Sequence, residues 1–450
     1  MQAAENKMGI MPVNRLIVNM SLPMVISMLV MALYNIVDSM FVSWISEEAL
    51  TAVSTAFPVQ NLMIAVSTGT GVGLNALISK SLGEKQKDVA SEYAKNGLFL
   101  SLCSYIVFLI IGITAVKPFF MSQTSNAMII EHGVQYTVIV TTLSFGIFFE
   151  ICFERLMQST GRTFYAMVTQ IIGAVVNIIF DPIFIFTFKM GVAGAAYATV
   201  LGQIVAALVA CILNARKNHD ISLKFSGFRP SGKLIGRIYA IGVPSIIMSS
   251  IGSVMYYGVN KILIVMNETA SAVFGVYFKL QSFVFMPIFG LNNGIIPIIG
   301  FNYGAGNRKR IMHTFKLGII YSVVIMALGT VVFQVFPDAL FAIFRASDHM
   351  LSMGRPALRI ISICFIVAGV DIVFGSLFQA FGFGVMSMMV SITRQLIVLL
   401  PAAYLLSLSG SVNAVWWSFP ISEVASLLVS IGFFAYIYKK TVSKIPRGVD

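Results

Sequence analysis

Residues 16–45 read LIVNMSLPMVISMLVMALYNIVDSMFVSWI and contain one charged side chain, Asp38. A helix needs about 20 mainly apolar residues to cross the hydrocarbon of a bilayer, so this run is long enough to span it. The run is also longer than the apolar region of a signal peptide, and no clear cleavage site follows it. It therefore predicts a membrane-spanning helix close to the start of the chain.

The composition extends this prediction to the whole chain. Of its 450 residues, 58% are hydrophobic and 11% are charged, whereas soluble domains are roughly 45–50% apolar and 25% charged. This excludes a soluble enzyme and a disordered chain. Twelve apolar runs predict an all-α integral membrane protein with twelve transmembrane helices, at 16–45, 50–79, 96–116, 134–157, 164–188, 191–213, 236–266, 270–301, 312–336, 357–380, 385–408 and 412–438.

The basic residues predict the orientation of these helices. With both termini in the cytoplasm, 22 Lys and Arg residues fall on the cytoplasmic side and five on the opposite side. Cytoplasmic loops of membrane proteins carry such an excess. The net charge of +12 is therefore an orientation signal rather than a sign of nucleic-acid binding. We expect a multi-pass protein of the cell membrane with both termini cytoplasmic.

The two halves of the chain resemble each other. The polar loop at 214–233 divides it into predicted lobes at 1–213 and 234–450. Gly73 matches Gly294 and Gln158 matches Gln379, both at an offset of 221 residues. Six spans per half give repeats of the same orientation, an arrangement of transporters that bind substrate at the repeat interface. We expect two pseudo-symmetric six-helix lobes.

Several motifs, in order along the chain, carry a resemblance to a known family. They are Leu22-Pro23 through Tyr34-Asn-Ile-Val-Asp38, Gly69-Thr-Gly-Val-Gly73, Gln158-Ser-Thr-Gly161, Asn177-Ile-Ile-Phe-Asp181-Pro182 and Gly191-Val-Ala-Gly-Ala-Ala196. With these the chain resembles the multidrug and toxic compound extrusion (MATE) family over essentially its whole length, and its bacterial drug pumps best. The resemblance implies efflux of drugs driven by entry of Na⁺ or H⁺.

Acidic side chains at membrane depth mark a candidate ion site in the first half. Asp38 follows Tyr34 by one turn, and Asn177 shares a helix face with Asp181. Pro182 should kink the helix and free carbonyl oxygens. Charges at this depth cost about 2.5–3.5 kcal/mol, which favours a function for them. These oxygens suit a hard cation, or a proton shared by the two carboxylates; the alternative is a polar cluster that only joins helices.

The resemblance assigns further residues to this region. It implies that Asp38, Asn177 and Asp181 lie at ion-coupling positions, with Thr199 beside them. It also implies that Tyr34, Tyr136 and Glu154 line the same cavity, although some members have an amide where Glu154 stands. In the second half, aromatic, methionine and amide side chains suit an adaptable cavity, and we expect Tyr256, Met286 and Asn293 to contribute to it.

The second half lacks the acidic cluster. Asn260 stands where Asp38 would repeat, and Val398 where Asn177 would. The charges that remain within or beside its spans are expected to be buried; they are Lys261, Lys279, Asp371 and Arg394. Intramembrane charges usually pair with each other, so we expect Asp371 to pair with Lys279 or Arg394. The alternative is an ion site in the second half.

These features together favour a secondary antiporter that exports amphipathic, often cationic compounds in exchange for Na⁺ or H⁺. A flippase for lipid-linked saccharides is the alternative, but its diphosphate substrate would require Arg and Lys in the cavity. A membrane prenyltransferase would require Asp-rich motifs that hold Mg²⁺, and a passive channel would not require a repeat. We therefore expect no enzyme activity, no cofactor apart from the coupling ion, no nucleic-acid partner and a monomer.

Overall fold

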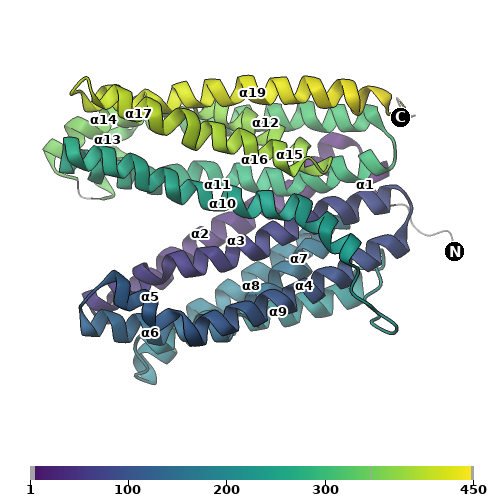
Figure 1. Cartoon of the computed structure of the whole chain (residues 1–450), viewed down its shortest axis with the longest axis horizontal. Coiled ribbons are helices and arrows are strands. Elements are labelled where there is room, and N and C mark those ends of the chain that lie inside the picture. Colours follow the sequence, from purple (N-terminus) through teal and green to yellow (C-terminus); the bar gives the residue numbers. More distant parts are fainter. Residues whose placement is uncertain (1–5, 345, 447–450) are drawn as a thin grey trace. The chain divides into compact units, whose positions relative to one another are not determined.

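The computed structural model describes residues 6–344 and 346–446, and every regular element within them is a helix (Figure 1). The first half contains α1 (Lys7–Ile10), α2 (Val13–Ser43), α3 (Glu47–Gly83), α4 (Lys87–Thr114), α5 (Val116–Gln123), α6 (Ala127–Thr142), α7 (Phe145–Ser159), α8 (Thr163–Pro182), the π-helix η1 (Ile183–Thr187) and α9 (Val192–Lys217). The second half contains α10 (Gly232–Met266), α11 (Glu268–Gly304), α12 (Arg308–Val335), α13 (Pro337–Ala342), α14 (Asp348–Ser362), α15 (Phe365–Ala380), α16 (Gly384–Ile392), the π-helix η2 (Thr393–Leu399), α17 (Leu400–Ser407), α18 (Val412–Trp416), α19 (Ser418–Lys440) and the 3₁₀-helix η3 (Val442–Lys444).

The predicted all-α membrane architecture is confirmed. Within the described residues, ten helices are long and apolar enough to cross a membrane, and two bent pairs bring the total to twelve. The bent pairs are α6 with α7, at 46°, and α14 with α15, at 45°. The sequence predicts each pair as one span, but it does not predict these bends.

The sequence predicts a kink near Pro182, and the structure shows a change of helix type there. Proline cannot donate a backbone hydrogen bond, and its ring crowds the preceding turn. The helix continues past Pro182 as the π-helix η1, in which each carbonyl bonds one residue further along than in an α-helix. The second half has a comparable π-helix, η2, shortly before Pro401.

The repeat extends to the backbone of the turns and caps. Residues with positive φ recur at an offset of 221, as do side chains that cap helix N-termini; the pairs are Lys85 and Gly306, Gly161 and Gly382, Lys189 and Gly410, Ser46 and Asn267, and Asn126 and Ser347. Because the offset is 221 at Pro23 and Pro244 and again at the Ser46 and Asn267 caps, the counterpart of Asp38 is Val259. The assignment of Asn260 as that counterpart is wrong by one residue.

The chain forms two compact units. Among the described residues, unit 1 comprises Asn6, Lys7 and Ile26–Ile246, and unit 2 comprises Met8–Val25 and the residues that follow Ile246. The first part of α2 therefore groups with the second half of the chain, and the first part of α10 groups with the first half.

Glycines explain this grouping. In unit 1, a Cβ on Gly73 of α3 would lie 2.4 Å from the carbonyl oxygen of Ile238 on α10. In unit 2, a Cβ on Gly294 of α11 would lie 2.8 Å from the Cα of Ser21 on α2. Both glycines allow the helix backbones to approach closely, as small residues commonly do between membrane helices. Since the two glycines are 221 residues apart, the repeats build the same helix contact twice.

Candidate functional site

Two acidic side chains meet inside unit 1. Asp38 on α2 and Asp181 at the end of α8 lie close enough to interact electrostatically. Asp181 is completely buried, and Asn177 one turn before it is 2% exposed. Two carboxylates in such proximity repel each other, so one of them is protonated or a cation lies between them. The structure therefore brings together the three side chains that the sequence singled out at this depth.

The oxygens of this pair face no hydrogen-bond donor. Among the described residues, no N–H or O–H group bonds to Oδ1 of Asp38, to either oxygen of Asp181 or to Oδ1 of Asn177, although all four atoms are buried. A buried acceptor without a partner costs roughly 1–3 kcal/mol. A proton or a hard cation with oxygen ligands satisfies such a set. We refer to Asp38, Asn177 and Asp181 as the acid site.

A second layer of hydrogen bonds surrounds the acid site. Nδ2 of Asn177 donates to Oγ1 of Thr199 on α9, at 3.4 Å. The Thr199 hydroxyl also lies near the hydroxyl of Tyr136 on α6. The Tyr136 oxygen accepts from Nε2 of Gln60 on α3, at 2.9 Å. Sequence reasoning did not identify Gln60, although an amide within an apolar helix is a signal that could have drawn attention to it.

A second pair of acids lies one turn apart on α7. Glu154 accepts from Oγ1 of Thr169 at 3.0 Å and from Nε2 of Gln170 at 2.8 Å, both on α8. Glu150 interacts electrostatically with Glu154 and with Tyr34. The acidic side chains of unit 1 therefore continue along α7 beyond the acid site. The sequence analysis assigned Glu154, but not Glu150, to the cavity.

The candidate cavity residues of the second half lie in unit 2. The ring of Tyr256 packs against Phe274 and Phe278, with centroids 5.1 and 4.7 Å apart. Met286 and Asn293 lie half-buried on α11. The expectation that Lys261 and Lys279 are buried is wrong, because both side chains are exposed. The Lys279 ammonium lies 6.0 Å from the centre of the Phe344 ring.

The partners of Asp371 differ from those expected. Asp371 on α15 is 3% exposed and accepts hydrogen bonds from two hydroxyls of α19, Ser426 at 3.0 Å and Ser430. Arg394 in η2 lies 3.8 Å from Oε2 of Glu423 on α19. The predicted ion pair of Asp371 with Lys279 or Arg394 is therefore wrong. Ser426 and Ser430 lie one turn apart on α19, so both hydroxyls reach Asp371, while Glu423 supplies the charge opposite Arg394.

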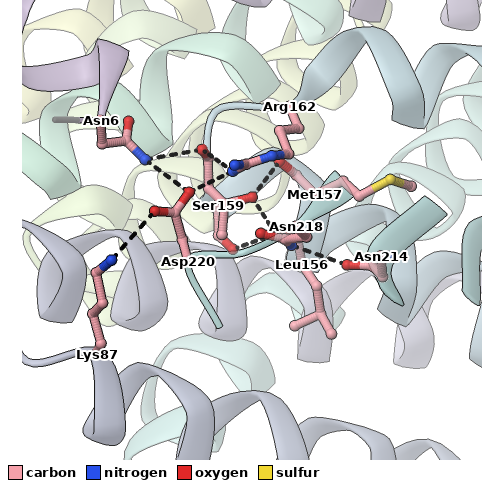
Figure 2. Close-up of polar contacts among 10 residues, drawn as sticks. Asn6, Lys87, Leu156, Met157, Ser159, Arg162, Asn214, Asn218 and Asp220 are labelled. Atoms are coloured by element: carbon pink, nitrogen blue, oxygen red, sulfur yellow. Dashed lines mark hydrogen bonds and ion pairs between the residues drawn. The ribbon is translucent and has the colours of Figure 1, made fainter. Parts of the chain in front are cut away.

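The start of the loop at 214–233 is fixed to unit 1 by an aspartate (Figure 2). Asp220 lies 2.5 Å from Nη1 of Arg162 and 3.9 Å from Nζ of Lys87, and it accepts from Nδ2 of Asn6 at 3.4 Å. Burial, together with the nearby charge of Arg162, lowers the pKa of Lys7 to about 8. We call Asn6, Lys7, Lys87, Arg162 and Asp220 the Asp220 cluster.

Within the described residues, no group of three or more His, Cys, Asp or Glu side chains could hold a metal ion. A cation at the acid site would therefore be bound by two carboxylates together with neutral oxygens. Asn177 and Thr199, which are hydrogen-bonded to each other, would supply neutral oxygens. Such a mixed set of oxygen ligands suits a hard cation.

Comparisons with known proteins agree with this arrangement. The family model described as MatE matches residues 23–183 and 241–405, one segment in each half. The multidrug export protein MepA of Staphylococcus haemolyticus (strain JCSC1435) is 27% identical over 431 residues, which are 94% of each chain. MepA of Staphylococcus aureus (strain NCTC 8325 / PS 47) is 27% identical over 437 residues, 93% of each chain. A solved multidrug resistance MATE family transporter of the MOP superfamily, in an outward-facing conformation, has a TM-score of 0.92 at 25% identity and covers 99% of this chain and 100% of its own.

Proposed function

Because the chain belongs to the MATE family of multidrug transporters, we propose that it is an antiporter that exports amphipathic, often cationic compounds in exchange for Na⁺ or H⁺. It is a multi-pass membrane transporter of small molecules and not an enzyme. The exchange, the coupling ion and the chemical class of the substrates are the parts that we propose.

One observation carries the proposal of ion coupling: the acid site has four buried acceptor oxygens and no donor among the described residues. Such a site lacks one positive charge or proton. Entry of the coupling ion supplies that charge or proton, and release of the ion leaves the site negative again. If ion and substrate bind in opposition, each lowers the affinity of the other by the same factor. That reciprocity is what an antiporter requires.

The charge distribution of unit 1 supports a cationic substrate. Asp38, Asp181, Glu150 and Glu154 form an acidic region, in which Glu150 interacts with both Glu154 and Tyr34. Amphipathic cations would gain from these carboxylates and from the face of the Tyr34 ring. A lipid diphosphate would be repelled here, which argues against a flippase. We propose Tyr34, Tyr136 and Glu154 as substrate residues in unit 1, and Tyr256, Met286 and Asn293 in unit 2.

The remaining assignments follow the charge pattern and the repeat. We propose that the protein lies in the cell membrane with both termini in the cytoplasm, and that it works as a monomer. Its lobes would be 1–213 and 234–450, joined by the loop at 214–233.

The test is transport of ethidium by the purified protein in proteoliposomes, with Na⁺ and pH gradients imposed independently. We expect uphill ethidium movement with one gradient and none when both gradients are absent. The ion whose gradient suffices is the coupling ion. Equal ethidium movement with and without either gradient would contradict antiport.

A further inference from the structure

The loop between α9 and α10 is attached to α4 at both of its ends. Near the start of the loop, the backbone N–H of Ser222 donates to Oγ of Ser91 on α4, at 2.9 Å. At the end of the loop, the backbone N–H of Ser231 donates to Oδ1 of Asn96, also on α4, at 3.0 Å. Ser91 and Asn96 are both buried. We refer to residues 218–231 as the strap, because these bonds hold the loop along the first turns of α4.

A tight turn in the middle of the strap leaves an aromatic side chain exposed. The N–H of Phe228 donates to the carbonyl oxygen of Phe225 at 3.0 Å, which closes the turn. Gly227 is the third residue of this turn and has a φ of 72°, which glycine adopts without strain. The Phe228 ring packs between Phe225, at 5.3 Å, and Phe99 of α4, at 6.4 Å. Phe225, at the outer end of this stack, is 48% exposed.

Basic side chains flank the exposed ring. Residues 221–240 contain no acidic side chain and four basic ones, which are Lys224, Arg229, Lys233 and Arg237. All four are exposed. The acid just before this stretch, Asp220, is already paired with Arg162 and Lys87. The strap and the start of α10 therefore present a positive surface around an apolar ring.

The positions of α9 and α10 place the strap at the surface of the bilayer. Both helices are long and apolar enough to cross a membrane, and the strap joins the end of one to the start of the other. It therefore lies where the hydrocarbon meets water. Apolar rings beside Lys and Arg are typical of segments that lie among lipid headgroups. Clusters of basic residues next to a spanning helix attract anionic headgroups.

We propose that the strap and Lys233 bind the headgroups of anionic phospholipids, with the Phe225 ring inserted between the acyl chains. Lys224 and Arg229 lie on either side of the turn, so phosphate contacts and insertion of the ring can form together. Arg229 can hold two phosphate oxygens at once. A soluble anion would gain nothing from the exposed ring, which is why the partner is a lipid. This inference goes beyond the proposed function, because it depends neither on the exported compound nor on the coupling ion.

The experiment measures lipid binding to the purified full-length protein in detergent by native mass spectrometry, with phosphatidylglycerol and phosphatidylcholine titrated separately. We expect phosphatidylglycerol to bind more tightly. Its binding should weaken as ammonium acetate rises from about 0.1 M to 1 M, because the screening length falls from about 10 Å to 3 Å.

Two variants separate the charges from the ring. The triple variant Lys224→Gln, Arg229→Gln and Lys233→Gln should weaken phosphatidylglycerol binding at least about tenfold, since each basic side chain near an anionic surface contributes roughly a factor of five. Phe225→Ser should weaken it about fivefold, because roughly half of an apolar ring returns to water. Both changes are at exposed positions, and an unchanged melting temperature would show that the variants are folded.

Phe188 and Lys189 provide a matched control at the other end of α9. Both side chains are exposed, and both precede the first residue of α9, Val192. The 26 residues of α9 extend about 39 Å, so this pair lies at the opposite surface of the bilayer from the strap. Phe188→Ser with Lys189→Gln should change phosphatidylglycerol binding less than about twofold, whereas Phe225→Ser with Lys224→Gln should weaken it at least about tenfold.

Four outcomes would each overturn the inference. They are equal binding of the two lipids by the wild type, unchanged phosphatidylglycerol binding in the folded triple variant, an equal loss in the control pair at 188 and 189, and displacement of the lipid by an excess of inorganic phosphate. The last result would assign the strap to a soluble anion instead of a membrane lipid.

Discussion

Unit 1 and unit 2 each have an acidic side chain at the same place in the repeat, half-buried Glu150 and buried Asp371, and the partners of the two side chains differ. Glu150 of α7 and Asp371 of α15 are 221 residues apart, each in the helix that follows a bend. Asp371 receives two serine hydroxyls from α19. Glu150 instead joins an acidic region whose central pair, Asp38 and Asp181, has no donor among the described residues. The comparison teaches that the partners of a buried acid, more than its depth, distinguish a structural group from an ion-binding one.

A second pair of equivalent residues shows the same divergence. Gln60 and Gln281 occupy the same place in the repeat and both bond to a tyrosine. Gln60 donates to a tyrosine on another helix, which adjoins the acid site. Gln281 accepts from a tyrosine one turn away on its own helix. The framework of the repeat is thus shared, while the direction of its hydrogen bonds differs between the units.

The largest expected effect is on transport activity, and it should distinguish Asp181 of unit 1 from Asp371 of unit 2. Asp181→Asn should reduce gradient-driven ethidium efflux at least about tenfold, since a coupling energy of some 1–3 kcal/mol disappears with the carboxylate. Its melting temperature should change little, because no donor loses a partner. Asp371→Asn should keep efflux coupled. It should lower stability by about 1.5–3 kcal/mol, the value of hydrogen bonds to a charged acceptor.

Proteoliposome efflux and thermal unfolding in detergent, measured on the same preparations, check this pair of variants. A stable Asp371→Asn protein without coupling would place an ion site in unit 2. A coupled Asp181→Asn protein would remove the acid site from the mechanism.

An effect on stability alone is expected at the ion pair of unit 2. Arg394 and Glu423 are 3.8 Å apart, with side chains 19% and 14% exposed. Glu423→Gln leaves the Arg394 charge without its partner, and breaking a buried pair in this way costs about 3–5 kcal/mol. Thermal unfolding should show the loss, and Arg394→Met with Glu423→Gln should recover part of it. A double variant less stable than Glu423→Gln would contradict this account.

An exposed pair in the same unit provides the control. Asp338 and Arg355 lie 2.5 Å apart with side chains 55% and 47% exposed, and the hydrogen bond from Arg355 holds the pKa of Asp338 below its usual value. Water screens such pairs, so Asp338→Asn should leave the melting temperature within the error of the measurement. A loss as large as that of Glu423→Gln would show that pairing, not burial, sets the cost.

Exchanging residues between the repeats gives a third test. A Cβ on Gly71 would lie 2.5 Å from Cγ of Arg155. At the equivalent positions unit 2 has Asn292 and Ser376, which are hydrogen-bonded to each other. Gly71→Asn should therefore destabilise by about 1–3 kcal/mol through overpacking. Adding Arg155→Ser reproduces the pair of residues that unit 2 has at these positions, so it should recover stability. Thermal unfolding of the single and the double variant checks this.

Much of this fold could be predicted from the sequence, because apolar runs and a constant offset depend only on residue type and spacing. Asp38, Asn177 and Asp181 were also identifiable, since polar groups are rare in such runs. The contact of Gln60 was not, because its partner is a tyrosine 76 residues along the chain on another helix. Ser426 and Ser430 look ordinary in an apolar helix, although their spacing of four residues was a signal that they share a face. The bends before α7 and α15 have no proline to mark them.

The smallest expected effect concerns the Asp220 cluster of unit 1. The pKa of Lys7 is about 8 in the folded protein, against 10.5 for a free lysine. Between these values the unfolded chain binds more protons than the folded one, so stability rises with pH from about 8 to 10.5. Below pH 8 the charged lysine is a cost to the folded state, which solvent screening limits to about 1 kcal/mol. Lys7→Gln should remove that cost and flatten this part of the profile.

Thermal unfolding of both proteins from pH 7 to pH 10.5 checks the sign, because other lysines and tyrosines titrate equally in the two and cancel in the difference. The variant should be the more stable protein at pH 7, and its advantage should vanish by pH 10.5. Asp220→Asn should enlarge the cost of Lys7, since it removes the negative charge that balances Arg162. A stability advantage of Lys7→Gln that grows with pH would contradict this account. It would mean that the folded protein stabilises Lys7 as a cation, as unit 2 stabilises the charged Arg394.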